Sequence, residues 1–140
     1  MAYGQDFLSS ARRHLTAADQ LYSDDKHAMG PGNRAVAGYL FGIAGELALK
    51  QLMKVSGMKQ LCTSQHRGDP FYAHFPQLKS QLRDTLCGRR SGELLVHAKN
   101  NRLFEHWSTD MRYAPTTDVK SEWTEAWKAQ AKSLVDAMSL

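Results

Sequence analysis

The sequence predicts an all-α protein: a bundle of four or five helices that forms a single domain over residues 1–140. Apolar residues recur at every third or fourth position through most of the chain, which is the period of one helix face. No segment shows the alternation of apolar and polar residues that is typical of a half-buried strand. The four prolines stand where the apolar period breaks, and therefore mark loops and helix starts.

The first predicted helix covers about residues 3–22. Its large apolar residues lie at helical spacing with alanines between them, and they are Tyr3, Phe7, Leu15, Leu21 and Tyr22. A Gly-Pro-Gly sequence at positions 30–32 ends this helix.

The second predicted helix covers about residues 33–55, with Asn33 suited to the N-cap position. An apolar stripe follows one face through Val36, Leu40, Ile43 and Leu47. The helix also carries many small residues, namely Ala35, Ala37, Gly38, Gly42, Ala44, Gly45 and Ala48. Small side chains let a neighbouring helix approach closely, so we expect this helix to be central and the most buried.

A third helix is expected after an irregular stretch at residues 56–75. Pro76 suits the first turn of this helix, and Gly88 suits its end. The inward positions repeat every four residues, at Leu78, Leu82 and Leu86.

Two further helices are expected near the C-terminus. Ser91 is expected to cap a helix with four buried apolar residues, which are Leu94, Leu95, Ala98 and Phe104. Pro115 then ends a joint, and Asp118 is expected to cap the last helix. Its inward residues are Val119, Trp123, Trp127, Leu134 and Met138.

The net charge of +4 is unevenly distributed. Residues 48–102 contain ten Lys or Arg and three Asp or Glu, a net charge of +7, while the remainder of the chain carries −3. A basic middle favours an anionic partner such as RNA or a nucleotide. The alternative is a solvated surface without a ligand.

The sequence also indicates a cytoplasmic protein without metal or cofactor. No segment reaches the roughly 18 apolar residues that a membrane span requires, and the N-terminus lacks the apolar core of a signal peptide. The two cysteines, Cys62 and Cys87, form no spaced cluster, which is typical of a reduced compartment, although a single disulfide between them remains an alternative. The six histidines show no zinc-binding spacing with a cysteine or carboxylate.

Several short motifs occur in an order that resembles one family. Glu46 and Lys50 stand four residues apart on the second helix, and His74 precedes Leu78 at the start of the third. Arg112 and Tyr113 then come shortly before Pro115, with Ala114 between. The chain in these respects resembles the HEPN family, small helical domains that occur beside nucleotidyltransferases and in prokaryotic defence systems.

The resemblance implies an up-and-down HEPN-like bundle that binds nucleic acid or nucleotides. It also implies a role in a defence or toxin–antitoxin system, with a protein partner or as a homodimer. Many HEPN proteins are metal-independent ribonucleases with an Arg, a polar residue and a His four to six residues beyond the Arg. Here three residues separate Arg102 from His106, and the Asn precedes the Arg. Six residues separate Arg90 from His97, but Ser91 follows the Arg. Three hypotheses therefore stay open: a binding module, a ribonuclease, and a non-catalytic interaction scaffold.

Arg102 and His106 are the candidate catalytic residues. Because they are four residues apart, we expect them to share one helix face with Lys99. The imidazole could act as general base on a ribose 2′-hydroxyl, and the guanidinium could hold the scissile phosphate. The alternative is an exposed polar face at a helix end, where basic groups complement the helix dipole.

Further candidate binding residues are Glu46, Lys50, Lys99, Trp107, Arg112 and Tyr113. Arg112 and Tyr113 could bind a phosphate and stack a base, with Trp107 as a second stacking surface. Alternatively, Trp107 and Tyr113 plug the end of the bundle while Arg112 pairs with Glu46 or another buried acid. Glu46 and Lys50 would belong to a site if they face a groove, and would otherwise form a surface ion pair.

Overall fold

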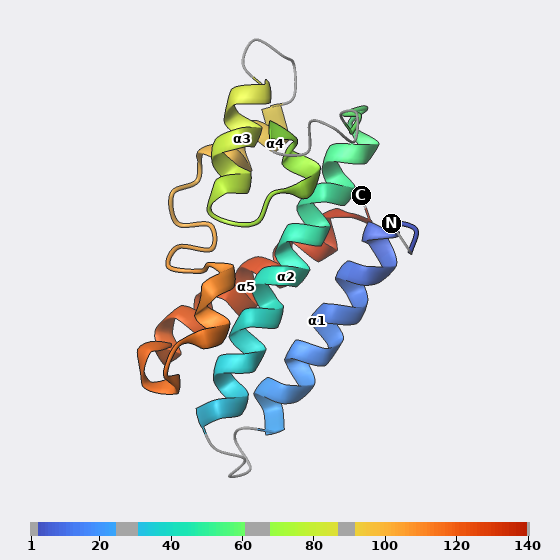
Figure 1. Cartoon of the computed structure of the whole chain (residues 1–140). Coiled ribbons are helices and arrows are strands. Elements are labelled where there is room, and N and C mark those ends of the chain that lie inside the picture. The colour runs from blue at the N-terminus through green and yellow to red at the C-terminus, as the bar shows by residue number, and fades with distance from the viewer. Residues whose placement is uncertain (1–2, 25–30, 61–67, 87–91, 140) are drawn as a thin grey trace.

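The computed structural model describes residues 3–24, 31–60, 68–86 and 92–139 (Figure 1). Within these ranges the only regular secondary structure is helical, with no strand, which confirms the all-α prediction. The α-helices are α1 (Phe7–Asp24), α2 (Pro31–Val55), α3 (Gln77–Leu86), α4 (Gly92–Lys99) and α5 (Ser121–Ala137). Three short 3₁₀ helices join them, namely η3 (Pro70–Tyr72), η4 (Thr109–Tyr113) and η5 (Thr116–Asp118).

Helix α2 is the central element, as its small residues predict. It runs antiparallel to α1 and contacts α5 along its length, while α3 and α4 pack together near its C-terminal end (Figure 1). Residues on several of its sides are fully buried, among them Ala37, Phe41, Ala44, Ala48, Leu49 and Met53.

The predicted apolar stripe of α2 is not its most buried face. Val36 is 49% exposed, and Leu40, Ile43 and Leu47 are only partly buried. The fully buried residues Ala37, Phe41, Ala44 and Ala48 lie one position further along the chain. Because helices cover α2 from two sides, its apolar residues surround most of the helix, and the pattern does not identify one inward face.

The glycines of α2 admit aromatic rings as well as a neighbouring helix. A Cβ atom at Gly42 would lie 1.9 Å from the Trp107 ring, and one at Gly45 would lie 2.3 Å from the Phe104 ring. A Cβ at Gly38 would lie 3.0 Å from Trp127 of α5. The slim face of α2 is therefore filled mainly by two side chains from the segment after α4.

Several predicted helix boundaries are wrong. Helix α2 begins at Pro31, so Asn33 lies inside its first turn rather than at the cap. Helix α5 begins at Ser121 with Lys120 at the N-cap position, and Asp118 is the last residue of η5. Helix ends commonly vary by one or two residues, so local capping preferences alone do not fix them. Cys62, Cys87, Gly88, Arg90 and Ser91 lie outside the described residues.

The predicted helix that would bury Phe104 ends early. Helix α4 stops at Lys99, and residues 101–106 form turns. Leu94 and Ala98 are buried in α4 as expected, but Phe104 reaches the core from the turn. Arg102 and His106 therefore do not share a helix face with Lys99, which is a correction to the sequence prediction.

None of the described helices is both long enough and apolar enough to cross a membrane.

Candidate functional site

The turn that follows α4 is built around two buried aromatic rings. Phe104 and Trp107 are 1% and 2% exposed, and their rings occupy the spaces beside Gly45 and Gly42 of α2. Phe104 also stacks on Phe75 at 4.8 Å between ring centroids. The Trp107 indole N–H donates to the Gly38 carbonyl at 3.1 Å. With these two rings anchored, the intervening residues Glu105 and His106 remain exposed at the surface.

The backbone of this turn is unusual for residues other than glycine. Phe104 has a φ of 51° and His106 a φ of 70°, in the left-handed region that side chains with a Cβ rarely adopt. Such conformations cost roughly 1–3 kcal/mol each and persist only where surrounding contacts enforce them. They are also concentrated at functional sites, so the turn is a candidate site on geometric grounds.

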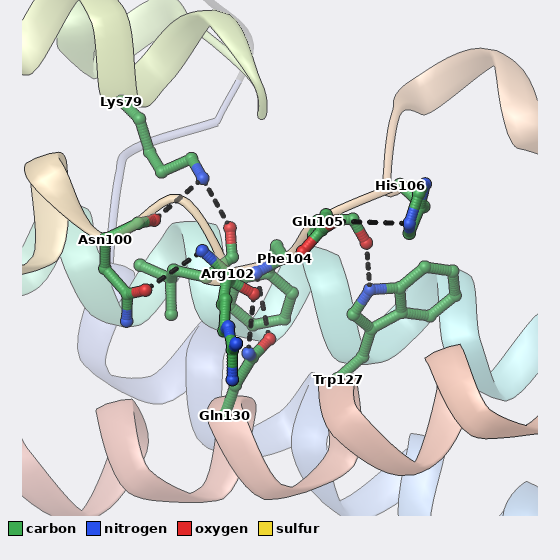
Figure 2. Close-up of polar contacts among 9 residues, drawn as sticks. Lys79, Asn100, Arg102, Phe104, Glu105, His106, Trp127 and Gln130 are labelled. Carbon is green, nitrogen blue, oxygen red and sulfur yellow. Dashed lines mark hydrogen bonds and ion pairs between the residues drawn. The ribbon is translucent and has the colours of Figure 1, made fainter.

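Side chains from α3 and α5 hold the turn by its backbone (Figure 2). Lys79 Nζ donates to the carbonyls of Asn100 at 3.0 Å and Leu103 at 2.7 Å. The pKa of the Lys79 ammonium is lowered, mainly by burial. From α5, Gln130 Nε2 donates to the Arg102 carbonyl at 2.8 Å, and Gln130 Oε1 accepts from the Phe104 amide at 2.9 Å.

Trp127 completes the attachment of the turn to α5. Its indole N–H donates to the Glu105 carbonyl at 2.9 Å (Figure 2). Trp127 is 1% exposed, whereas Glu105 is exposed, so this hydrogen bond is partly buried. Together with the two Gln130 contacts, it ties the backbone of residues 102–105 to one face of α5.

A cleft of about 320 Å³ lies between this turn and α5. Its lining residues come from the turn and from one stripe of α5, and they are Arg102, Glu105, His106, Trp123, Ala126, Trp127 and Gln130. The volume is at the lower end of small-ligand sites, which run from about 300 to 1,000 Å³. The cleft thus combines a guanidinium, a carboxylate, an imidazole and an indole.

The imidazole of His106 has two neighbours in the cleft. Its ring stacks on that of Trp123, with centroids 4.3 Å apart and an interplanar angle of 18°. Its Nε2 lies 3.3 Å from Glu105 Oε1, and both side chains are about half exposed. Lys120 Nζ lies 5.2 Å from the centroid of the Trp123 ring. The imidazole is therefore oriented by one carboxylate and one indole.

Arg102 and His106, the predicted catalytic pair, do line the same cleft. Both reach the cleft from the turn at residues 101–106, not from one face of a helix. Lys99 is exposed at the last position of α4 and does not line this cleft.

Trp107, Arg112 and Tyr113, which were also predicted to bind a ligand, do not line the cleft. Trp107 is buried against Tyr39, with ring centroids 5.6 Å apart, so it cannot offer a ring face to a base. Tyr113 is 77% exposed, which excludes the alternative that it plugs the end of the bundle. Arg112 is also exposed and does not pair with Glu46; it donates to the Tyr39 hydroxyl at 3.4 Å and lies 4.9 Å from the Tyr113 ring centroid. The pKa of Arg112 is raised, mainly by its hydrogen bond with Tyr39.

Glu46 and Lys50 do not form the predicted surface ion pair, because both are buried, at 2% and 6% exposure. Glu46 Oε1 accepts from the Phe75 amide at 2.8 Å, and its Oε2 lies 2.9 Å from His74 Nδ1. Burial lowers the pKa of Lys50, while the charges of Glu46 and Asp69 oppose that shift. This cluster joins α2 to the segment before α3 and has no part in the cleft.

Sequence reasoning did not identify Glu105, Trp123, Gln130 or Lys79 as site residues. One signal was available, because positions 123, 127 and 130 follow the spacing of one helix face and combine two indoles with an amide. Lys79 carried no such signal. Among the described residues, no group of three or more His, Cys, Asp or Glu side chains could hold a metal ion.

No family model, curated protein or solved structure matches the chain.

Proposed function

We propose that the cleft between the turn and α5 binds a phosphate group of RNA or of a nucleotide. One observation carries the proposal: Arg102 and His106 line the same cleft, and the ring of Trp123 lies beside them. A guanidinium is suited to a phosphate because its planar donors match two phosphate oxygens. Trp123 is partly exposed, and the exposed part of an indole can contact a base or a sugar.

Arg112 and Tyr113 form a second exposed pair, outside the lining of the cleft, for the proposed nucleic-acid contact. The Arg112 guanidinium is held by the Tyr39 hydroxyl and lies over the Tyr113 ring. Within the described chain Arg112 forms no ion pair with a carboxylate, so its charge is not neutralised by an acid. Exposed tyrosine and arginine together are suited to stacking and to phosphate contacts.

A HEPN-like module is the wider proposal to which this site belongs. Two residues of the family-like motif, Glu46 and His74, are in contact at 2.9 Å, which supports a common role in the fold. Action in the cytoplasm, in a defence or toxin–antitoxin system and with a protein partner or as a homodimer, belongs to the same proposal. The defence or toxin–antitoxin role and the partner rest on the resemblance alone and carry the weight of a fold analogy, whereas the cytoplasmic location rests on the composition of the sequence.

A metal-independent ribonuclease is the second candidate, and the Glu105–His106 contact favours it. The Glu105 carboxylate lies 3.3 Å from Nε2, on one side of the ring, and Nδ1 would act as the base. Nδ1 would take the proton of a ribose 2′-hydroxyl, and the 2′-oxygen would attack phosphorus while the 5′-oxygen leaves with a proton from water. Arg102 would offset the negative charge that develops on the phosphate.

The binding proposal is tested by fluorescence anisotropy with a short labelled single-stranded RNA at low ionic strength. We expect Arg102→Ala and His106→Ala each to weaken binding about 10- to 100-fold, because a hydrogen bond to a charged group contributes about 1.5–3 kcal/mol. Arg12→Ala and His14→Ala are matched controls, since they remove the same side chains from α1, away from the cleft and outside the basic region of residues 48–102.

The outcomes separate the three hypotheses. Equal losses in the cleft variants and the controls would contradict a specific site. No binding by the wild-type protein would leave the interaction scaffold. Cleavage of the RNA in the presence of EDTA, abolished by His106→Ala, would establish the ribonuclease.

A further inference from the structure

We infer that Gln130 is a positioning residue, whose side-chain amide sets Arg102 and His106 against the same cleft. For its binding readout the inference rests on the proposed function, but its structural readout does not. The residue lies on α5, whereas Arg102 and His106 lie in the turn after α4.

Both ends of the Gln130 amide are engaged by the turn. The nitrogen donates to the Arg102 carbonyl and the oxygen accepts from the Phe104 amide, at 2.8 and 2.9 Å (Figure 2). A primary amide supplies a donor and an acceptor in one plane, as a peptide group does. The two contacts therefore fix the orientation of the two consecutive peptide groups on either side of Leu103.

The buried rings alone would not fix those peptide groups. The rings of Phe104 and Trp107 are held by the spaces at Gly45 and Gly42, which locates the two side chains. The left-handed φ angles of Phe104 and His106 are nevertheless unfavourable for such residues. The turn needs a contact that selects this backbone, and Gln130 contacts the residue at which the first left-handed angle occurs.

The other anchors of the turn act at different points. Lys79 binds the carbonyls of Asn100 and Leu103 from the side of α3, and so holds the entry to the turn. Trp127 binds the Glu105 carbonyl and lies next to Gln130 on the cleft face of α5. Only Gln130, among these three side chains, binds an N–H group of the turn as well as a carbonyl.

Gln130→Met tests the inference, because it keeps the length of the side chain but removes both hydrogen bonds. The first readout needs no ligand: the ring protons of His106 should be shifted upfield by the Trp123 ring in proton NMR spectra, and His106→Ala identifies these signals. We expect Gln130→Met to lose the shift and to weaken binding of single-stranded RNA about tenfold. Gln77→Met, an exposed glutamine at the start of α3, is the matched control.

A double variant adds a second criterion. If Gln130 acts through His106 and Arg102, the effects of Gln130→Met and His106→Ala should overlap. The double variant should then lose less RNA-binding free energy than the sum of the losses in the two single variants. Strict additivity would overturn the inference. Should Gln130→Met fail to fold, Gln130→Glu retains the acceptor for the Phe104 amide and removes the donor to the Arg102 carbonyl, and the same NMR shift decides.

Failure of the inference and failure of the proposed function remain distinguishable. If a folded Gln130 variant keeps the upfield His106 signals, the inference is overturned whatever the RNA result. If the wild-type protein binds no RNA, the proposed function fails, and loss of the upfield signals in the variant would still support Gln130 as the residue that positions His106.

Discussion

Glu46 joins α2 to the start of α3 through both oxygens of one buried carboxylate. One oxygen accepts the Phe75 amide, and the other contacts His74, whose side chain is 55% exposed. Lys50, one turn further along α2, is also buried. A buried charge is tolerated only with partners, and removal of one partner typically costs 3–5 kcal/mol. This buried cluster therefore stabilises the contact between α2 and the segment before α3. Arg102 and His106, in contrast, are exposed and accessible to a ligand.

His97 gives a pH-dependent prediction at the scale of a single residue. This half-buried side chain lies near the end of α4, and burial lowers its pKa below the ordinary 6.5, with Glu93 opposing. As pH falls below that ordinary value, the unfolded chain takes up a proton that the folded chain still excludes. Stability therefore falls with pH in this window and levels off below the folded pKa.

The His97→Gln variant removes this contribution. Relative to the wild type, its melting temperature should rise as the pH is lowered from about 7 to about 5. Comparison of the two proteins at each pH cancels the titration of the other histidines. A difference in melting temperature that stays constant over this range would contradict the prediction.

Helix α2 shapes the site by supporting the turn that lines the cleft. Its glycines leave space for Phe104 and Trp107, and those two rings hold the turn that carries Glu105 and His106. Glycine weakens a helix by up to about 1 kcal/mol relative to alanine. In α2 this cost is offset because the rings pack directly against the helix.

Gly42→Ala should therefore destabilise the protein, although alanine favours a helix. The new Cβ would lie 1.9 Å from the Trp107 ring, so the indole must move and lose its hydrogen bond to Gly38. We expect a loss of about 1–3 kcal/mol in urea unfolding, and a larger one for Gly42→Leu. Gly92→Ala is the control, because a Cβ there meets nothing within 4 Å. Equal stability of Gly42→Ala and wild type would show that Trp107 does not fill this space.

Charge is distributed unevenly over the whole molecule, with +7 in residues 48–102 and −3 elsewhere. Arg102 stands at the end of the basic region and lines the cleft. A basic region raises the local concentration of an anionic partner and makes its binding dependent on salt. The cleft and the basic region could therefore serve one nucleic-acid ligand.

Charge reversal of Arg89 and Arg90 to Glu tests this idea. Both residues lie outside the described part of the chain, so the prediction rests on the sequence. If they contact phosphates, the double variant should bind RNA more weakly, and the slope of log K against log salt should flatten by about one to two units. Arg12→Glu with Arg13→Glu, on α1, is the matched control. A wild-type protein that shows no salt-dependent retention of RNA would contradict the proposal.

Local pattern alone determined that the chain is helical and that α2 is central, because apolar period and residue size are properties of short segments. The pairing of Arg102 with His106 was also visible in the sequence, but as a helix face that does not exist, since α4 ends at Lys99. Only the tertiary structure decided how they meet. Gln130 lies 28 residues from Arg102, and the spaces at Gly42 and Gly45 are filled by rings more than 50 residues away. Phe104 and His106 adopt left-handed backbone angles although neither is a glycine, so the sequence contains no local sign of this turn. Contacts from α2 and α5, rather than local preference, stabilise these angles.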